Sequence, residues 1–239
     1  MNRTEQLQAL GQSLWLDNIT RAMLDDGRLR HYMDEFSITG LTSNPTIFKQ
    51  AIEDTNSYND DIRDRFAAGQ SGETLFVELA LADLRRAADM FASVFDATDG
   101  VDGWVSMEIS PLLAADTAGS VEAAARIRRQ GDRPNLFVKI PGTPAGIPAI
   151  EESIFAGVPI NVTLLFSCEQ YVAAAEAYLR GIERRVTAGL DPRVASAASL
   201  FVSRWDHAVS GFAPPELRNR LGIAIATRTY RAYRELLAS

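Results

Sequence analysis

The chain has 239 residues, 46% of them hydrophobic and 23% charged, which is the composition of an ordinary globular protein. Its net charge of −7 and its lack of a Lys/Arg-rich run argue against a nucleic-acid-binding or membrane-binding surface. With one cysteine and two histidines, the chain cannot form an internal disulfide and is poorly equipped for a His/Cys zinc site, so we expect no metal. The N-terminal residues lack a signal-peptide core and no apolar run approaches about 18 residues, so we expect a cytoplasmic protein.

Hydrophobic periodicity and turn residues predict alternating helices and strands along the whole chain. Strands are expected at residues 14–19, 37–44, 104–110, 136–142, 159–166 and 194–205, the last with its following turn. Helices are expected at residues 4–12, 21–30, 56–70, 71–99, 119–129, 144–156, 168–185 and 215–237, with a further one beginning at Pro45. This alternation is typical of a parallel sheet with right-handed crossovers.

No repeat of fixed period and no linker rich in Pro, Gly or Ser interrupts this pattern, so a single domain over residues 1–239 is expected. No G-x-G-x-x-G or P-loop motif follows any predicted strand, which leaves a dinucleotide or P-loop fold without support. The continuously apolar strands therefore favour a TIM-type (β/α) barrel over a doubly wound sheet.

A lysine stands in the middle of the strand predicted at residues 136–142, which reads Leu-Phe-Val-Lys-Ile-Pro-Gly. Of the 24 basic residues only Lys49 and Lys139 are lysines, so this chain places a lysine where an ammonium group is costly to bury. An amine, unlike a guanidinium, can lose its proton and attack a carbonyl carbon. The strand alone leaves two interpretations open: a Schiff-base lysine, or a side chain that reaches solvent at a strand end.

Polar side chains recur in or just after each predicted strand. They are Asp17, Asn44, Glu108, Lys139, Asn161 with Thr163, and Ser199. In a barrel such residues converge on one mouth, where the active site lies. Individually some have structural alternatives: Asp17 and Asn44 as helix N-caps, Glu108 as an edge-strand acid and Thr163 as a β-former. Their recurrence on six successive strands favours a site.

The same set is chemically coherent. An apolar pocket favours the neutral amine of Lys139, which could then attack a ketone. The resulting iminium would permit cleavage of a neighbouring carbon–carbon bond, with Asp17 and Glu108 available for the two proton-transfer tasks. Asn44 and Asn161 could hold substrate hydroxyls.

Six stretches in the expected order resemble the transaldolase family, of the type found in actinobacteria. They are Leu14–Asp17 (LWLD), Gly40–Phe48 (GLTSNPTIF), Val105–Glu108 (VSME), Val138–Thr143 (VKIPGT), Ile160–Leu164 (INVTL) and Ser199–Arg204 (SLFVSR). The resemblance implies a class I enzyme, without a cofactor, that moves a dihydroxyacetone unit from a ketose phosphate to an aldose phosphate.

By position, the resemblance also implies a role for each residue. Lys139 would form the Schiff base and Asp17 would deprotonate the donor's C4 hydroxyl. Glu108, with a water oriented by Thr163, would shuttle protons. The remaining residues would bind substrate: Asn44 and Asn161 at the dihydroxyacetone hydroxyls, Ser199 and Arg204 at the phosphate end, and Phe201 in the pocket wall. A guanidinium fork suits a phosphate, although Arg204 could instead form an ordinary surface salt bridge.

The chain departs from the family in having six predicted strands, and we expect the seventh and eighth to be missing or replaced. Because an unclosed barrel leaves strand edges open, we expect closure by a partner chain in a homo-oligomer, by the terminal helix, or by residues 207–214. The missing region would normally contribute to phosphate binding, which suggests a specialised sugar substrate.

Two rival functions remain. One is a fructose-6-phosphate-type aldolase that releases dihydroxyacetone; such enzymes generally carry Gln and Tyr where this chain has Glu108 and Phe201, so both positions favour transfer. The other is a non-catalytic truncated paralogue that acts as a subunit, against which the intact set of Lys139, Asp17 and Glu108 argues.

Overall fold

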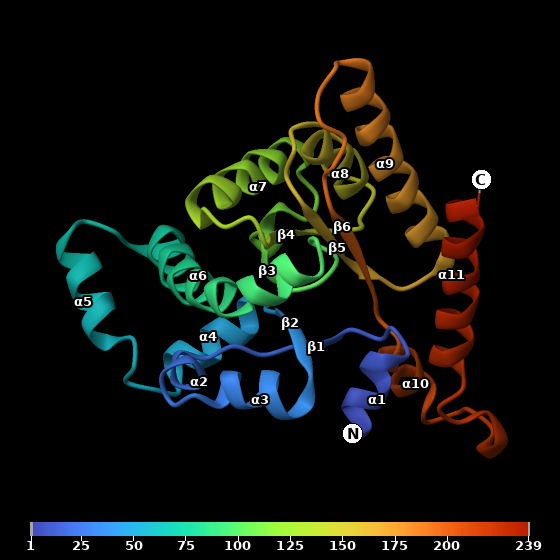
Figure 1. The fold of residues 1–239 in the computed structure, drawn as a ribbon, viewed down its shortest axis with the longest axis horizontal. Helices are drawn as coiled ribbons and strands as arrows, with labels where there is room; N and C mark the ends of the chain where they lie inside the picture. Colours follow the sequence, from blue (N-terminus) through green and yellow to red (C-terminus); the bar gives the residue numbers. More distant parts are fainter. Residues whose placement is uncertain (1, 239) are drawn as a thin grey trace. The chain divides into compact units, whose positions relative to one another are not determined.

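The computed structural model describes residues 2–238, and its six strands lie in one sheet in chain order (Figure 1). The strands are β1 (Leu14–Leu16), β2 (Ile38–Thr42), β3 (Val105–Glu108), β4 (Leu136–Pro141), β5 (Ile160–Leu165) and β6 (Ser196–Leu200). Helices before β3 are α1 (Arg3–Ala9), α2 (Arg21–Asp25), α3 (Arg28–Phe36), α4 (Pro45–Glu53), α5 (Asn59–Ala67) and α6 (Gly72–Ala97). After β3 come α7 (Thr117–Gly131), α8 (Gly146–Phe155), α9 (Cys168–Thr187), α10 (Ser203–Val209) and α11 (Leu221–Ala238), with 3-10 turns at Pro111–Leu113 and Pro215–Leu217.

The recorded strand pairs β1–β2, β2–β3 and β5–β6 are all parallel, and at least one helix separates each strand from the next along the chain. Sequential parallel strands joined by helices are the arrangement of a TIM-type (β/α) barrel, so the predicted fold class is confirmed. Within residues 2–238, no strand pairs with the second edge of β6. Among the described helices, none combines the length and apolar character needed to span a bilayer.

The chain forms two compact units whose division falls inside β4. Unit 1 comprises Met1–Glu108 and Arg126–Val138, and unit 2 comprises Ile109–Ala125 and Lys139–Ser239. The residues predicted to carry chemistry are therefore divided between the two units, and each unit is described separately.

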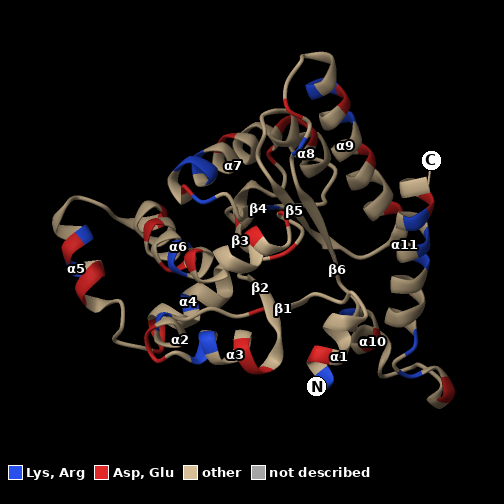
Figure 2. Ribbon diagram, in the orientation of Figure 1, with Lys and Arg blue, Asp and Glu red and all other residues tan. Residues whose placement is uncertain are grey.

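In unit 1, the long helix α6 packs against β2 and β3 and buries its apolar face completely at Leu84 and Phe91. Aromatic rings fill the core beneath the strands: Trp104 stacks on Phe137 with ring centroids 3.9 Å apart. Gly40 of β2 lies directly against Trp15, since a Cβ there would come within 2.6 Å of the indole nitrogen. Helix α5, in contrast, buries none of its residues and carries charges of both signs, as Figure 2 shows. The core of unit 1 thus lies between α6 and the strands.

Unit 2 is organised around β5, with α8 and α9 packed against one another. Gly181 of α9 permits their close approach, because a Cβ there would lie 2.9 Å from the carbonyl oxygen of Glu151. The predicted capping box begins α9: the Gln170 N–H donates to the Ser167 hydroxyl at 3.2 Å. Helix α11 packs against α9 in turn.

The largest differences from the predicted elements concern two helices and one strand. Residues 21–30 form no single helix, because Gly27 adopts φ +81° and separates α2 from α3. The sixth strand ends at Leu200, and α10 follows it, with the Trp205 indole N–H donating to the carbonyl of Phe166 at 2.7 Å. Residues 207–214 therefore contain the end of α10 and no strand. Helix α11 begins only at Leu221, whose N–H donates to the Asp206 carboxylate at 3.0 Å.

Candidate active site

Three predicted site residues lie at the carboxyl ends of the strands of unit 1. Asp17 directly follows β1, Asn44 follows β2 by two residues, and Glu108 is the last residue of β3. Because β1, β2 and β3 are parallel, these positions share one edge of the sheet. Asp17 is exposed, whereas Asn44 and Glu108 are half-buried. Unit 1 therefore presents two carboxylates and one amide along the edge where barrel enzymes carry their active sites.

Asn44 caps a helix, as its alternative interpretation predicted. The backbone N–H of Ile47 donates to Asn44 Oδ1 at 3.0 Å, and Pro45 occupies the first turn of α4. Capping uses the amide oxygen and leaves the Nδ2 group as a donor. Next to it, the buried Ser43 hydroxyl donates to the carbonyl of Ser106 at 2.9 Å and ties the end of β2 to β3. The cap and a substrate-binding role are thus compatible in one side chain.

Glu108 does not lie on an edge strand, because β3 lies between β2 and β4 in the sheet. The edge-strand explanation for this carboxylate is therefore wrong. A half-buried acid at the end of an interior strand, where the strand residues before it are fully buried, calls for another explanation.

Lys139 lies in the middle of β4, and all six residues of this strand are buried. The lysine is only 6% exposed, so the interpretation in which its side chain reaches solvent at a strand end is wrong. The other lysine, Lys49, is exposed and pairs with Glu53 at 3.7 Å on the surface of α4. The chain therefore has one surface lysine and one core lysine.

The buried amide of Asn161 is held by the neighbouring strand. Ser199 of β6 donates its hydroxyl to Asn161 Oδ1 at 2.8 Å, and Asn161 is only 1% exposed. This contact uses the oxygen of the amide, so the Nδ2 donors of Asn161 take no part in it. The assignment of Ser199 to the phosphate end stays a prediction, and nothing in the sequence indicated the contact between its hydroxyl and Asn161.

The backbone beside these residues departs from a regular ladder. The β5–β6 register shifts between Val162 and Leu165, and Leu164 adopts φ +57°, an unfavourable conformation for a side chain of this kind. Thr163, which precedes it, is 1% exposed and accepts the N–H of Gly142 at 2.7 Å on its backbone oxygen. Bulges and strained residues of this kind cluster at functional sites, where they redirect side chains.

The segment after β6 carries the last two predicted site residues. Phe201 packs on Phe166 with ring centroids 5.1 Å apart, and the guanidinium of Arg204 lies 4.8 Å from the centre of the Phe201 ring. Arg204 is exposed in the first turn of α10, and the described residues form no recorded ion pair with it. Its surface-salt-bridge alternative therefore has no support: the guanidinium stacks on an aromatic ring and keeps its donors for an anion.

A buried polar network in unit 1 gave no signal in the sequence. Asp83, fully buried in the middle of α6, accepts hydrogen bonds from the Tyr58 hydroxyl at 2.7 Å and from Arg21 Nε at 2.9 Å. Burial raises the pKa of the Asp83 carboxyl, and the bonds from Tyr58 and Arg21 oppose that rise. The network joins α2 and the N-cap residue of α5 to α6, and none of its three side chains directly follows a strand. We interpret it as a scaffold.

Chemically, unit 2 offers a buried amine with a fixed amide donor and an exposed guanidinium, and unit 1 offers two carboxylates. An amine suits covalent catalysis on a carbonyl compound, and the carboxylates suit proton transfer.

Comparison with known proteins places this chain in a protein family. A family model described as transaldolase/fructose-6-phosphate aldolase matches residues 14–239. Proteins described as transaldolases from Thiobacillus denitrificans, Saccharopolyspora erythraea and Acidothermus cellulolyticus are 43%, 42% and 41% identical to this chain, and each alignment covers 98% of it. The alignments cover 68%, 65% and 65% of those relatives, so the chain spans about two thirds of their length. A solved structure described as a putative fructose-1,6-biphosphate aldolase from Coccidioides immitis covers 96% of the chain at 9% identity and a TM-score of 0.37, a likeness too weak to carry an argument.

Proposed function

Because the chain belongs to the transaldolase/fructose-6-phosphate aldolase family, we propose that it transfers a dihydroxyacetone unit from a ketose phosphate to an aldose phosphate. The observation that carries this proposal is the core position of Lys139 in a chain whose other basic residues, apart from Lys49, are arginines. A lysine that is 6% exposed gives up hydration that a surface lysine keeps, and nucleophilic chemistry accounts for its presence there.

In the proposed mechanism, the Lys139 amine attacks the C2 carbonyl of the donor. Loss of water from the carbinolamine leaves an iminium, and Glu108 with a water oriented by Thr163 carries the protons of this step. Asp17 then takes the proton of the C4 hydroxyl, the C3–C4 bond breaks, and its electron pair moves into the iminium to give an enamine. The aldose phosphate fragment leaves as an aldehyde.

The second half of the reaction reverses these steps with a new aldehyde. The enamine carbon attacks the acceptor carbonyl, Asp17 returns the proton to the new hydroxyl, and water releases the product ketose from Lys139. Asn44 and Asn161 hold the hydroxyls of the dihydroxyacetone unit through their Nδ2 donors, while Phe201 lines the pocket. Arg204 and Ser199 are assigned to the phosphate end, and the Ser199 hydroxyl in addition donates to Asn161 Oδ1.

Sugar phosphates of carbohydrate metabolism are the proposed substrates, with a specialised acceptor and a cytoplasmic setting. A single domain over residues 1–239 remains part of this proposal.

Borohydride trapping tests the covalent step. The chain is incubated with fructose 6-phosphate, reduced with sodium borohydride and weighed intact by mass spectrometry. We expect an adduct of one dihydroxyacetone or hexose phosphate unit that Lys139→Met abolishes and the matched surface change Lys49→Met preserves. An adduct that survives Lys139→Met, or no adduct on the wild-type chain, would refute the Schiff-base assignment.

A second measurement separates transfer from release. With erythrose 4-phosphate present, a transferase forms a seven-carbon ketose phosphate, whereas an aldolase of the fructose-6-phosphate type releases free dihydroxyacetone. We expect the seven-carbon product. Free dihydroxyacetone as the main product would instead support the aldolase, the rival that the family description names.

A further inference from the structure

Helix α10 carries Arg204, and it is too short to hold its own position. It spans seven residues, Ser203–Val209, and buries none of them. Isolated helices of fewer than about 12 residues are marginal in water, so a helix of this size depends on contacts with neighbouring segments. The place of the Arg204 guanidinium is therefore decided by whatever fixes α10 within unit 2.

Two consecutive side chains of α10 fix it to its neighbours. The indole N–H of Trp205 donates to the carbonyl of Phe166 at 2.7 Å, which ties the helix to the residue after β5. The Asp206 carboxylate accepts the backbone N–H of Leu221 at 3.0 Å and that of Gly222 at 3.3 Å, which ties the helix to the start of α11. All these residues belong to unit 2. Anchors on two different sides of a helix fix its rotation about its axis as well as its position.

Asp206 and Arg204 lie on opposite sides of α10. Successive residues of an α-helix are turned by about 100°, so side chains two positions apart differ by about 200°. While Asp206 is held against α11, Arg204 occupies the other side of α10, where its guanidinium lies 4.8 Å from the centre of the Phe201 ring. The N–H of Phe201 donates to the carbonyl of Leu165 at 2.8 Å, at the carboxyl end of β5. The contact of Asp206 thus determines on which side of α10 the guanidinium lies.

The same contact keeps the Asp206 carboxylate away from Arg204. Asp206 is the acid nearest to Arg204 in the sequence, and an acid with available oxygens would compete with a substrate phosphate for the guanidinium. Both oxygens of Asp206 instead accept N–H groups at the start of α11, where the helix dipole stabilises a negative charge. A side chain of the protein thereby occupies this helix terminus, and Arg204 keeps its donors for an external anion.

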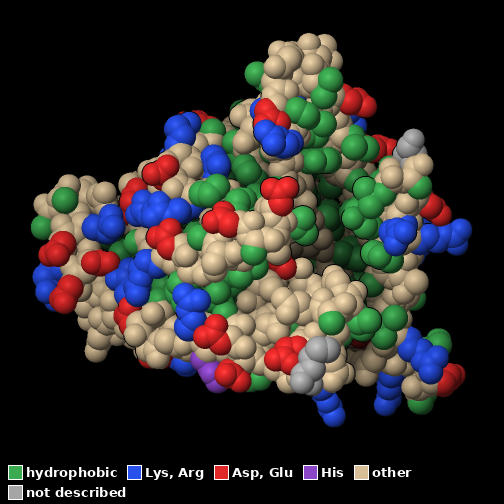
Figure 3. Space-filling model, viewed as in Figure 1, with side chains coloured by type: hydrophobic (Ala, Val, Ile, Leu, Met, Phe, Trp, Pro, Cys, Tyr) green, Lys and Arg blue, Asp and Glu red, His purple; other side chains and the backbone are tan. Residues whose placement is uncertain are grey.

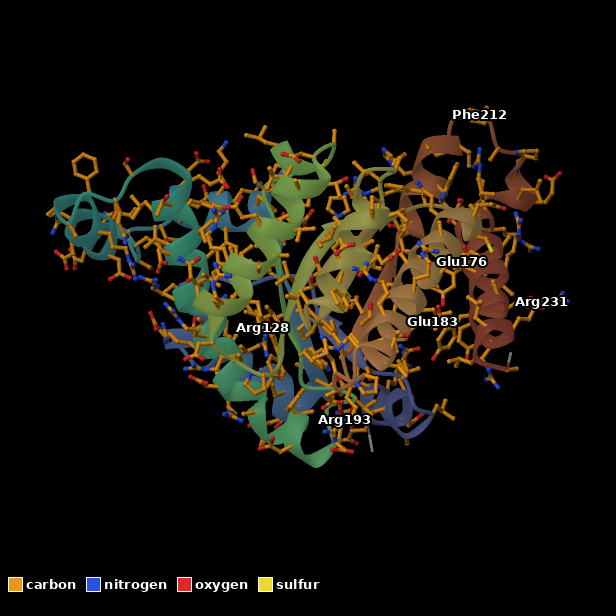
Figure 4. All side chains as sticks on the ribbon, turned by 90° about the horizontal axis from the view of Figure 1, so that it is seen from above. Arg128, Glu176, Glu183, Arg193, Phe212 and Arg231 are labelled. Atoms are coloured by element: carbon orange, nitrogen blue, oxygen red, sulfur yellow. The ribbon has the colours of Figure 1, made fainter. Side chains whose placement is uncertain are left out.

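Gly222 allows α11 to approach α10 closely enough for this contact. A Cβ at this buried position would lie 2.4 Å from the Val202 carbonyl oxygen and 2.7 Å from Asp206 Oδ2. The connection between the two helices contributes less, because Phe212 within it is 78% exposed and lies at the outer surface (Figure 4). The position of α10 against α11 therefore depends on Asp206 and Gly222.

We propose that Asp206 is a positioning residue for substrate binding. By anchoring α10 to the start of α11, it holds Arg204 on the side of the helix where the guanidinium meets the phosphate of the substrate. This inference rests on the proposed function, which assigns Arg204 to the phosphate end. Asp206 acts through Arg204 and does not touch the substrate. A contact that serves only the phosphate is made equally in the ground state and the transition state, so its loss raises KM and leaves kcat unchanged.

The test compares Asp206→Ala with Asp206→Asn in transfer from fructose 6-phosphate to erythrose 4-phosphate. Asparagine keeps an oxygen for the N–H groups of α11 and should hold the KM of the donor within about threefold of the wild-type value. Alanine should raise this KM by about tenfold and leave kcat within about twofold. The matched control is Asp116→Ala, since Asp116 Oδ1 accepts the N–H of Gly119 at 3.0 Å at the start of α7. It should leave KM within about twofold.

A double-mutant cycle shows whether Asp206 acts through Arg204. Arg204→Ala should raise KM at least as much as Asp206→Ala, and adding Asp206→Ala to it should raise KM no further than about twofold. Arginines are frequent around α11, as the basic side chains in Figure 3 show, so an arginine control is needed. Arg231→Ala breaks only an exposed pair with Glu235 at 2.9 Å, and the effect of Asp206→Ala should persist in that background.

A ketone without a phosphate separates this role from a general loss of folding. Borohydride trapping of free dihydroxyacetone on Lys139 should give as much adduct in Asp206→Ala as in the wild-type chain. A reduced adduct, equal KM changes in Asp206→Ala and Asp116→Ala, or additive effects of Asp206→Ala and Arg204→Ala would overturn the proposal. An inactive wild-type chain, or an unchanged KM in Arg204→Ala, would refute the proposed function and this inference with it. An unchanged KM in Asp206→Ala alone would refute only the inference.

Discussion

Removing the hydroxyl of Ser199 isolates the contact that orients Asn161. In the wild-type chain this hydroxyl donates to Asn161 Oδ1 at 2.8 Å, at a site where the amide is 1% exposed. Ser199→Ala leaves a buried carbonyl oxygen without that donor, at a cost of about 1–3 kcal/mol. If the Asn161 amide then rotates to bond with another group, its Nδ2 donors no longer point toward the substrate hydroxyls that the proposed mechanism assigns to them. We therefore expect kcat/KM for transfer to fall by about 5- to 150-fold, the same free energy expressed as a ratio.

The assay compares this variant with two others. Ser199→Thr keeps the hydroxyl and should restore most of the activity. Ser196→Ala removes a hydroxyl from the same strand whose bond, 2.9 Å to the carbonyl of Ile160, touches no proposed site residue. It should lower the free energy of unfolding by about 1 kcal/mol and leave kcat/KM within about twofold. If Ser199→Ala and Ser196→Ala reduce kcat/KM equally, or Ser199→Ala leaves it unchanged, the orienting role is refuted.

Three further predictions follow from the two units. Asn44→Asp keeps the oxygen that caps α4 but loses the Nδ2 donor, so kcat should fall about tenfold or more while the melting temperature stays within about 2 °C. The control Ser167→Ala removes the cap of α9 instead. It should lower the free energy of unfolding by about 1 kcal/mol without loss of kcat. Gly142→Ala would place a Cβ 2.4 Å from the Leu165 side chain, so it should destabilise the chain by about 1–3 kcal/mol in urea unfolding. The pKa of Asp83 in the folded chain is raised above its ordinary value of 3.8. The protonated carboxyl therefore contributes its full share to the free energy of unfolding below pH 3.8, and this share is lost as the pH rises through the pKa of the folded state. In unfolding curves between about pH 3 and about pH 7, Asp83→Asn should not show this loss of stability.

Each of these has a contrary outcome. Full activity in Asn44→Asp would mean that the side chain serves α4 alone. Unchanged stability in Gly142→Ala would show that β5 yields at no cost. For the pH experiment, Asp61→Asn is the matched control, since Asp61 also pairs with Arg21 but is 44% exposed. If Asp61→Asn and Asp83→Asn change the pH profile alike, burial is not the cause.

Much of the fold was predictable because its signals are local. The apolar runs of β4 and β5, Pro45 at the start of α4, and the Ser167/Gln170 box at the start of α9 each depend on residues a few positions apart. Two failures depend on more distant contacts: α10 is tied by the Trp205 indole to a carbonyl 39 residues away, and the start of α11 depends on Asp206. A periodicity of side chains carries no information about such partners. The split between α2 and α3 is local and lies at Gly27.

By itself, the sequence determined the residue types of the candidate site and their places at successive strand ends, because a parallel (β/α) arrangement sends every strand's carboxyl end to one edge. Tertiary structure alone decided which alternatives hold. It shows that Lys139 is buried. The four apolar residues around it in the chain could not predict this, because they do not reveal which segments pack on the two faces of the strand. It also decided that Ser199 bonds to Asn161, and that Asp206 accepts the first N–H groups of α11, because both depend on how segments distant in the chain approach one another.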